Sequence, residues 1–423
     1  MKKIQLSFMS IILVSGLIFQ ISVIPETLNL KVLGRVINIL VLFVLLILFI
    51  YAIHLKKYTQ VTIFYVIPVS LVLFGYFLNL LRSMDINSLR YTYILLPWLA
   101  AIAIPFDASL NTEKAWNIFY IFILITTTIS LIEYCAIFYG LLVPSIIETD
   151  RGSFLKGVIS LLHKIKDDEP YYRFYGVFGE PGTAAMFLSV ALTYALVFSK
   201  KLAALVFIIA LYLTDSLGGY LGFFITMTLF ILWKVNELHY SLLKKMVIIC
   251  SIVLIGFIFS NYFYTRFLIK QETASMTENI REDNIVNFIN NFSNVLTNYP
   301  LGYELNNLES NKDYYGSNLM CYVAFVQGGL LAFVGYCWFF LIISILSVRY
   351  YFLRHNPNKI IACAFISLPP MLTFAFQRTT IIECILFAFL FAVPLIEMIR
   401  GMSPTRGITI PQEKVAEILD YSA

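Results

Sequence analysis

Asparagine and tyrosine gather in one segment of an otherwise apolar chain. Twelve asparagines fall between Asn261 and Asn318, with Tyr262, Tyr264, Tyr299, Tyr303, Tyr314 and Tyr315 among them. Amide and phenol groups both donate and accept hydrogen bonds, and an aromatic face can cover a pyranose ring, so this composition suits sugar binding. A simpler interpretation stays open, because Asn is a common turn former and a low-GC genome enriches Asn and Tyr in any exposed loop.

An amphipathic helix is predicted within the same segment. Ser275 and Glu278 have the spacing of a capping box, and apolar residues then recur at helical intervals at Ile285, Phe288, Ile289, Phe292 and Leu296. Arg281 lies one turn before Ile285 on the apolar side, so its guanidinium is directed to the protein or to the membrane surface. Such an arginine either snorkels to headgroups, pairs with a local acid or binds a ligand, and the spacing does not separate these roles.

The rest of the chain has the composition of a polytopic membrane protein. Its 423 residues are 60% hydrophobic and 13% charged, about half the charge of a soluble domain. Apolar runs of spanning length occur about twelve times, at 4 to 24, 36 to 53, 61 to 81, 91 to 105, 116 to 143, 182 to 198, 202 to 214, 217 to 233, 246 to 263, 318 to 348, 359 to 377 and 380 to 398. We therefore predict an all-α polytopic integral membrane protein, a single domain over 1 to 423, with 10 to 12 transmembrane helices.

Basic residues predict which loops face the cytoplasm. With the amino terminus inside, sixteen of the thirty Lys and Arg residues fall on the inner side, which predicts that both termini are cytoplasmic. The same assignment places two long loops, 144 to 181 and 264 to 317, outside. Long loops between spans are uncommon unless they carry function or disorder, so we infer a site on the outer face.

Several other classes of site are not expected. The basic residues are scattered between apolar runs, which excludes a nucleic-acid-binding face. No metal site is predicted, because the four histidines, His54, His163, His239 and His355, stand far apart, and the acidic run at Asp167 has no neighbouring ligands. The six cysteines lie in apolar runs without a C-x-x-C pair, so neither zinc nor a disulfide framework is inferred.

A series of short motifs resembles a known family. In order they are Arg173-Phe-Tyr-Gly176-Val-Phe178-Gly-Glu180-Pro181, Asp215-Ser216 with Gly218-Gly219, Arg281 before the amphipathic helix that ends Asn298-Tyr-Pro300-Leu301-Gly302, and Ser317-Asn318 before Gly328-Gly329. Over roughly residues 170 to 340, this order resembles the bacterial O-antigen and capsule repeat-unit polymerases (Wzy-type) of the O-antigen polymerase and ligase superfamily. Ligases typically carry a His where this chain has Ser317, and Glu180 replaces an Asn that is common in the family. The missing His favours a polymerase.

The resemblance implies a GT-C-like, metal-independent membrane glycosyltransferase without a cofactor. Such an enzyme polymerises undecaprenyl-diphosphate-linked oligosaccharide into O-antigen or capsular polysaccharide on the outer face of the inner membrane. Its partners are the lipid-linked donor and acceptor and the bilayer, with a chain-length regulator and a flippase as further candidates.

The same resemblance assigns roles to residues. Arg173 and Arg281 match outer-face arginines that hold the lipid diphosphate, a task that suits bidentate guanidinium groups. Glu180, before Pro181 at the start of a helix, is either a general base or a carboxylate stabilised by the helix dipole, and the structural interpretation is favoured. The proposed substrate-binding residues are Asn318, Arg378, Asp215 and Tyr303, of which Asp215 also suits a helix cap and Arg378 a headgroup anchor.

Two alternative functions remain open. An O-antigen ligase is the nearest, and a lipid-linked oligosaccharide flippase or transporter belongs to another class. A transporter places polar residues near the bilayer midplane, whereas the main charged exceptions within the spans here, Glu133 and Glu383, lie towards the predicted outer ends. This distribution favours a site on the outer surface.

The loop assignment predicts the result of a labelling experiment. A cysteine introduced at Ser160 or Asn307 should react with a membrane-impermeant thiol reagent in intact spheroplasts, because both positions lie in predicted outer loops. A cysteine at Asn236 should stay unlabelled. Labelling at Asn236 with none in either loop would invert the topology.

Overall fold

The computed structural model describes residues 67–83, 112–149, 152–163, 172–237, 292–294, 296–302, 320–353 and 359–375, with isolated positions elsewhere. The expected spans at 4 to 24, 36 to 53, 91 to 105, 246 to 263 and 380 to 398 lie outside these ranges, apart from such isolated positions. The structure therefore describes much of the first predicted outer loop, the two helices that flank it in the chain, and five further helices.

Seven helices of the described residues coincide with seven of the apolar runs. They are α4 (Ile67–Ser83), α6 (Thr112–Phe138), α7 (Pro181–Val197), α8 (Lys201–Leu213), α9 (Leu217–Glu237), α14 (Met320–Leu353) and α15 (Lys359–Ala375). Three of them contain segments long and apolar enough to cross a membrane, namely Glu113–Phe138, Leu217–Val235 and Ala324–Ile342. The chain is thus helical and compatible with a membrane protein, while the number of twelve spans stays a prediction.

The first predicted outer loop forms a small sheet, so the expectation of an all-α chain was too simple. Strands β1 (Ser145–Thr149), β2 (Gly152–Lys156), β3 (Leu161–His163) and β4 (Arg173–Gly176) pair in sequence order, and each pair is antiparallel. The strands are three to five residues long. Strands this short give almost no period-two signal, and their pairing depends on neighbours that the sequence pattern does not specify.

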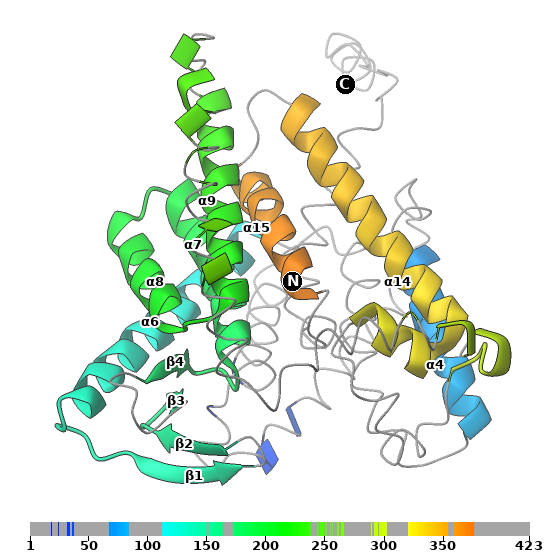
Figure 1. Ribbon diagram of the computed structural model, residues 1–423, viewed down its shortest axis with the longest axis horizontal. Helices are drawn as coiled ribbons and strands as arrows, with labels where there is room; N and C mark the ends of the chain where they lie inside the picture. The colour runs from blue at the N-terminus through cyan, green and yellow to red at the C-terminus, as the bar shows by residue number, and fades with distance from the viewer. Residues whose placement is uncertain are drawn as a thin grey trace, which may run out of the picture.

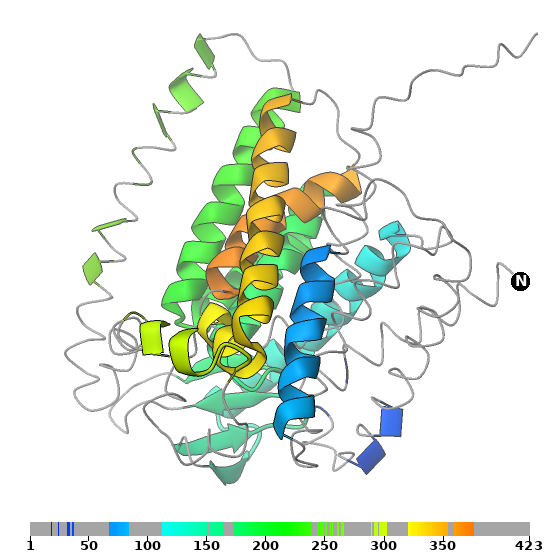
Figure 2. The same ribbon diagram turned by 90° about the vertical axis from the view of Figure 1, so that its right-hand side faces the viewer.

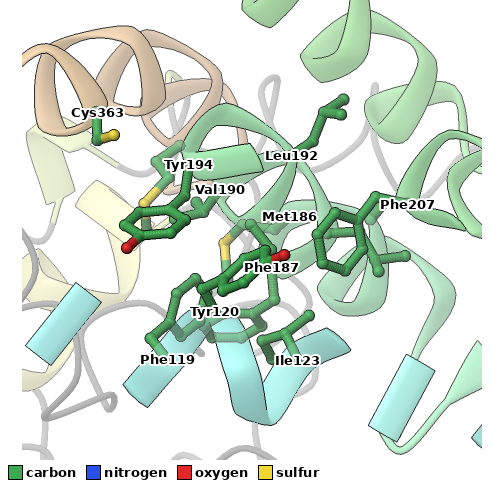
Figure 3. Close-up of a cluster of buried hydrophobic side chains, with 14 of the residues drawn as sticks. Phe119, Tyr120, Ile123, Met186, Phe187, Val190, Leu192, Tyr194, Phe207 and Cys363 are labelled. Atoms are coloured by element: carbon green, nitrogen blue, oxygen red, sulfur yellow. The ribbon is translucent and has the colours of Figure 1, made fainter. Parts of the chain in front are cut away.

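Helix α7 is the centre of one group of helices. Sixteen of its seventeen residues are buried, and it contacts α6, α8, α9 and α15, which surround it in Figure 1. Aromatic side chains fill the space between these helices (Figure 3): Tyr120 lies 4.8 Å from Tyr194 and 6.2 Å from Phe207, measured between ring centroids. The outward faces of α6 and α8 stay apolar at Ile125 and Leu205, as expected for helices with a lipid-facing side.

Helices α4 and α14 form a second, close pair (Figure 2). A Cβ atom on Gly75 would come within 2.4 Å of the carbonyl oxygen of Gly328, so the two backbones meet where only glycine fits. One residue further on, Gly329 has a φ of 68° and kinks α14. The Leu330 amide then donates a hydrogen bond of 2.9 Å to the carbonyl of Pro300, which places the Tyr299 to Gly302 turn against the kink.

The two ends of the helix bundle differ in character. The sheet and the turn at 299–302 both lie at the lower end in Figures 1 and 2. Towards the other end, Lys359 at the start of α15 lies 5.6 Å from the ring centroid of Phe198, which follows α7. Lys200 and Lys201 follow Phe198 after one residue, Ser199, so three lysines assigned to the cytoplasmic side gather at the end away from the sheet. Which end faces the cytoplasm stays a prediction.

The cysteine at Ser160 is poorly placed for the labelling experiment. Ser160 is fully buried, so a cysteine there would not test the topology, whereas Val158 in the same turn is 59% exposed. Val158→Cys is the appropriate outer-loop variant for the impermeant reagent.

Candidate functional site

Arg173 is the first residue of β4 and reaches the turn between α8 and α9. Its Nε donates to the carbonyl oxygen of Thr214 at 3.3 Å, and its Nη2 donates to that of Asp215 at 2.9 Å. Thr214 is the C-cap of α8, where carbonyl groups have no partner within the helix and the helix dipole is negative. The cation of Arg173 therefore satisfies the end of α8 and joins the sheet to the helices.

These two bonds use only part of the guanidinium. An arginine side chain carries five N–H donors in a fixed plane, and two of them are accounted for by the turn. Among the described residues, the other three have no protein acceptor. Because the guanidinium is half-buried and oriented by the carbonyl groups, its remaining edge can bind a phosphate through paired hydrogen bonds.

Asp215 lies directly beside Arg173, as its assignment to the same site requires. Its backbone carbonyl accepts from Arg173, while its carboxylate Oδ1 accepts from the Tyr220 hydroxyl at 3.3 Å. The helix cap is the next residue, because the Gly219 amide donates to the Ser216 hydroxyl at the start of α9. Asp215 itself has a φ of 44°, a left-handed conformation that aspartate tolerates better than most residues.

Glu180 occupies the N-cap position of α7, as its place before Pro181 predicted. Its backbone is extended, with φ −150° and ψ 145°, and Pro181 opens the helix. The carbonyl of Glu180 accepts the first helical hydrogen bond, from the Ala184 amide at 3.0 Å, but its side chain makes no cap bond. The half-buried carboxylate stands four residues after the end of β4, at the same end of the bundle as Arg173.

His163 is the residue that sequence reasoning missed. It is the direct cross-strand partner of Arg173, so both side chains share one face of the sheet. The imidazole lies among aromatic rings, 4.9 Å from Phe154 and 6.1 Å from Tyr175, and its Nδ1 has no hydrogen-bond partner among the described residues. Burial, and secondarily the positive charge of Arg173, lower the pKa of His163. Its only earlier consideration was as a metal ligand, and nothing local in the sequence pairs it with Arg173.

The other proposed site residues, Arg281, Asn318, Arg378 and Tyr303, lie outside the described residues. The end of the predicted amphipathic helix is described: Phe292 stacks on Phe325 of α14 at 4.9 Å. Two other members of the predicted apolar series, Ile289 and Leu296, are 65% and 36% exposed, so the amphipathic helix stays a prediction.

The turn that follows this helix is held by α4. Arg82 donates from Nη1 to the carbonyl oxygen of Gly302 at 3.0 Å. The second loop is thus tied to the bundle within its described part, as the first is at Arg173. Within the described ranges, no group of three His, Cys, Asp or Glu residues has a geometry suited to a metal ion.

Comparison with known proteins gives no relative. No family model matches the chain, and no curated protein and no solved structure is significantly similar to it. The family resemblance therefore rests on the quoted motifs alone, and the function is a proposal.

The lowered pKa of His163 predicts a pH-dependent stability. Since the unfolded imidazole binds a proton more tightly than the folded one, this contribution is complete above pH about 6.5 and is lost as pH falls through the lowered folded value. We expect the unfolding temperature in detergent to fall between pH 7 and pH 5. His163 lowers the free energy of unfolding by at most about 1.4 kcal/mol for each pH unit of this fall. In His163→Phe this contribution should be absent, so the unfolding temperature should depend less on pH. Identical pH profiles for both proteins would contradict the prediction.

Proposed function

We propose that this protein polymerises undecaprenyl-diphosphate-linked repeat units into O-antigen or capsular polysaccharide at the outer face of the inner membrane. The observation that carries the proposal is Arg173, a half-buried guanidinium with two N–H groups fixed on the end of α8 and an edge left for an anion. The resemblance of the surrounding motifs to the Wzy-type polymerases supplies the substrate class.

The proposed reaction is a displacement at a sugar carbon. An acceptor hydroxyl oxygen forms a bond to the anomeric carbon of the donor, the bond from that carbon to the diphosphate oxygen breaks, and undecaprenyl diphosphate leaves with the electron pair. Negative charge grows on the leaving diphosphate, so a preorganised cation in a site with little water lowers the barrier most effectively. Arg173 is the proposed cation, and Arg281 would complete the clamp.

The hydroxyl proton needs an acceptor. Glu180 is the proposed base because it stands at the bundle end that carries Arg173, at the N-cap of a helix whose dipole favours its ionised form. The competing proposal, a purely structural N-cap carboxylate, predicts that Glu180→Gln keeps polymerisation intact. In both cases the step needs no metal.

Arginine variants test the proposal in a deletion strain that carries the gene on a plasmid. Arg173→Ala and Arg281→Ala should be nearly inactive, and the Lys variants strongly impaired, because Lys keeps the charge and loses the fork. A loss of about 2 to 5 kcal/mol is expected for each Ala variant, and the double variant should be less than additively worse. The measurement is the length of the polysaccharide ladder on a gel, with membrane abundance measured in parallel.

Controls separate the outcomes. Lys201→Ala, at an exposed position of α8 away from Arg173, should keep a normal ladder. A deletion strain that keeps a single repeat unit on its lipid core identifies a polymerase, whereas loss of that unit as well points to the ligase. A normal ladder from well-expressed Arg173→Ala would remove Arg173 from the site.

A further inference from the structure

A buried carboxylate interrupts the apolar surface of α6. Glu133 lies five residues before the end of this membrane-length helix and is only 7% exposed. A carboxyl group in such surroundings needs hydrogen-bond partners that compensate for the water it has lost. Its partners therefore indicate what the residue is for.

The partners of Glu133 all belong to the turn between β2 and β3. The carboxylate accepts from the Ile159 amide at 3.2 Å and from the Ser160 amide at 3.1 Å, and it also accepts from the Ser160 hydroxyl. Ser160 is completely buried. A Cβ atom on Gly157 would come within 2.3 Å of Oε2 of Glu133, so the turn closes around the carboxylate.

The next residue of α6, Tyr134, contacts β4 and the residue before it. The Tyr134 hydroxyl donates to the carbonyl oxygen of Tyr172 at 3.0 Å, and the Tyr134 ring meets Phe174 edge to face with centroids 6.2 Å apart. Tyr172 and Phe174 are the two neighbours of Arg173 in the chain. Glu133 thus binds the turn before β3, and the next residue of α6, Tyr134, contacts the strand that carries Arg173.

We propose that Glu133 and Tyr134 are positioning residues that fix the guanidinium of Arg173. The connection is short: Ser160 immediately precedes β3, whose last residue, His163, pairs with Arg173 across the ladder. With the sheet held on α6, the side chain of Arg173 meets the end of α8 in one orientation. Without that hold, the sheet still meets the helices through Arg173, through the buried side chains of Leu162 and Phe174, and through the chain that joins it to α6 and α7.

The effect of Glu133 and Tyr134 on polymerisation rests on the proposed function, whereas their effect on the orientation of Arg173 does not. The first measurement therefore follows Arg173 without any substrate. Phenylglyoxal modifies accessible arginines, and mass spectrometry of the purified protein in detergent gives the modification rate of the peptide that contains Arg173. We expect this rate to rise about tenfold in Glu133→Ala, the change that leaves the buried Ser160 amide and the part-buried Ile159 amide without their acceptor, and by a few-fold in Glu133→Gln, Ser160→Ala and Tyr134→Phe.

Matched variants exclude general unfolding. Ile132→Ala changes the neighbouring residue of α6, whose side chain is 64% exposed, and should leave the rate unchanged. Tyr134→Phe keeps the ring on Phe174 and removes only the hydroxyl, so it should fold even if Glu133→Ala does not. Unfolding temperatures and the modification rate of Arg82 serve as references. An unchanged Arg173 rate in folded Tyr134→Phe and Glu133→Gln would overturn the proposal.

The polysaccharide ladder then tests the functional half. If Glu133 acts through Arg173, Glu133→Gln shortens the ladder in the wild-type background and has no further effect in an Arg173→Lys background. Equal effects in both backgrounds would overturn the positioning role. A raised Arg173 modification rate together with a normal ladder would support the positioning by Glu133 and Tyr134 but would remove Arg173 from the proposed polymerase site.

Discussion

Backbone polar groups that protein atoms cover need hydrogen-bond partners, and this requirement shapes the lower end of the bundle. Beyond the ends of helices and strands, side chains supply these partners. Arg173 does so for the carbonyl groups that end α8, Glu133 for the amides of the β2–β3 turn, and Arg82 for the carbonyl of Gly302. Charged residues that look out of place in an apolar chain are thereby explained as partners of the backbone.

The same requirement creates a place for an anion. A guanidinium that serves two carbonyl groups is held in one plane, and its other edge then lies in a fixed direction without further loss of side-chain entropy. Lysine has no second edge of this kind. The sheet adds to this arrangement. It holds Arg173 on a strand that contacts α6, and it places the neighbouring His163 among aromatic rings. The proposed binding function thus uses the edge of Arg173 that the structural contact leaves over.

The sequence predicted the helices well and the sheet not at all. Apolar runs and the polar break before Leu217 located the starts of α8 and α9 to within one residue, because turn composition is a local property. The sheet depends on pairing between residues far apart, such as His163 with Arg173, and its strands are too short to show a pattern. The contact of Arg173 with the carbonyl groups of Thr214 and Asp215 needed the structure, because no spacing rule pairs β4 with the α8–α9 turn. The anchoring role of Glu133 needed the structure, since the sequence shows only that a carboxylate interrupts an apolar helix.

Direct binding of the lipid tests the central claim, that Arg173 holds a lipid diphosphate. The purified protein in detergent is titrated with undecaprenyl diphosphate and, for comparison, undecaprenyl monophosphate, and the bound fraction is counted by native mass spectrometry. If Arg173 holds the diphosphate, the wild type and Lys201→Gln prefer the diphosphate, and Arg173→Gln loses this preference at a temperature at which all three proteins are folded. Equal binding of the diphosphate by the wild type and Arg173→Gln would contradict the account.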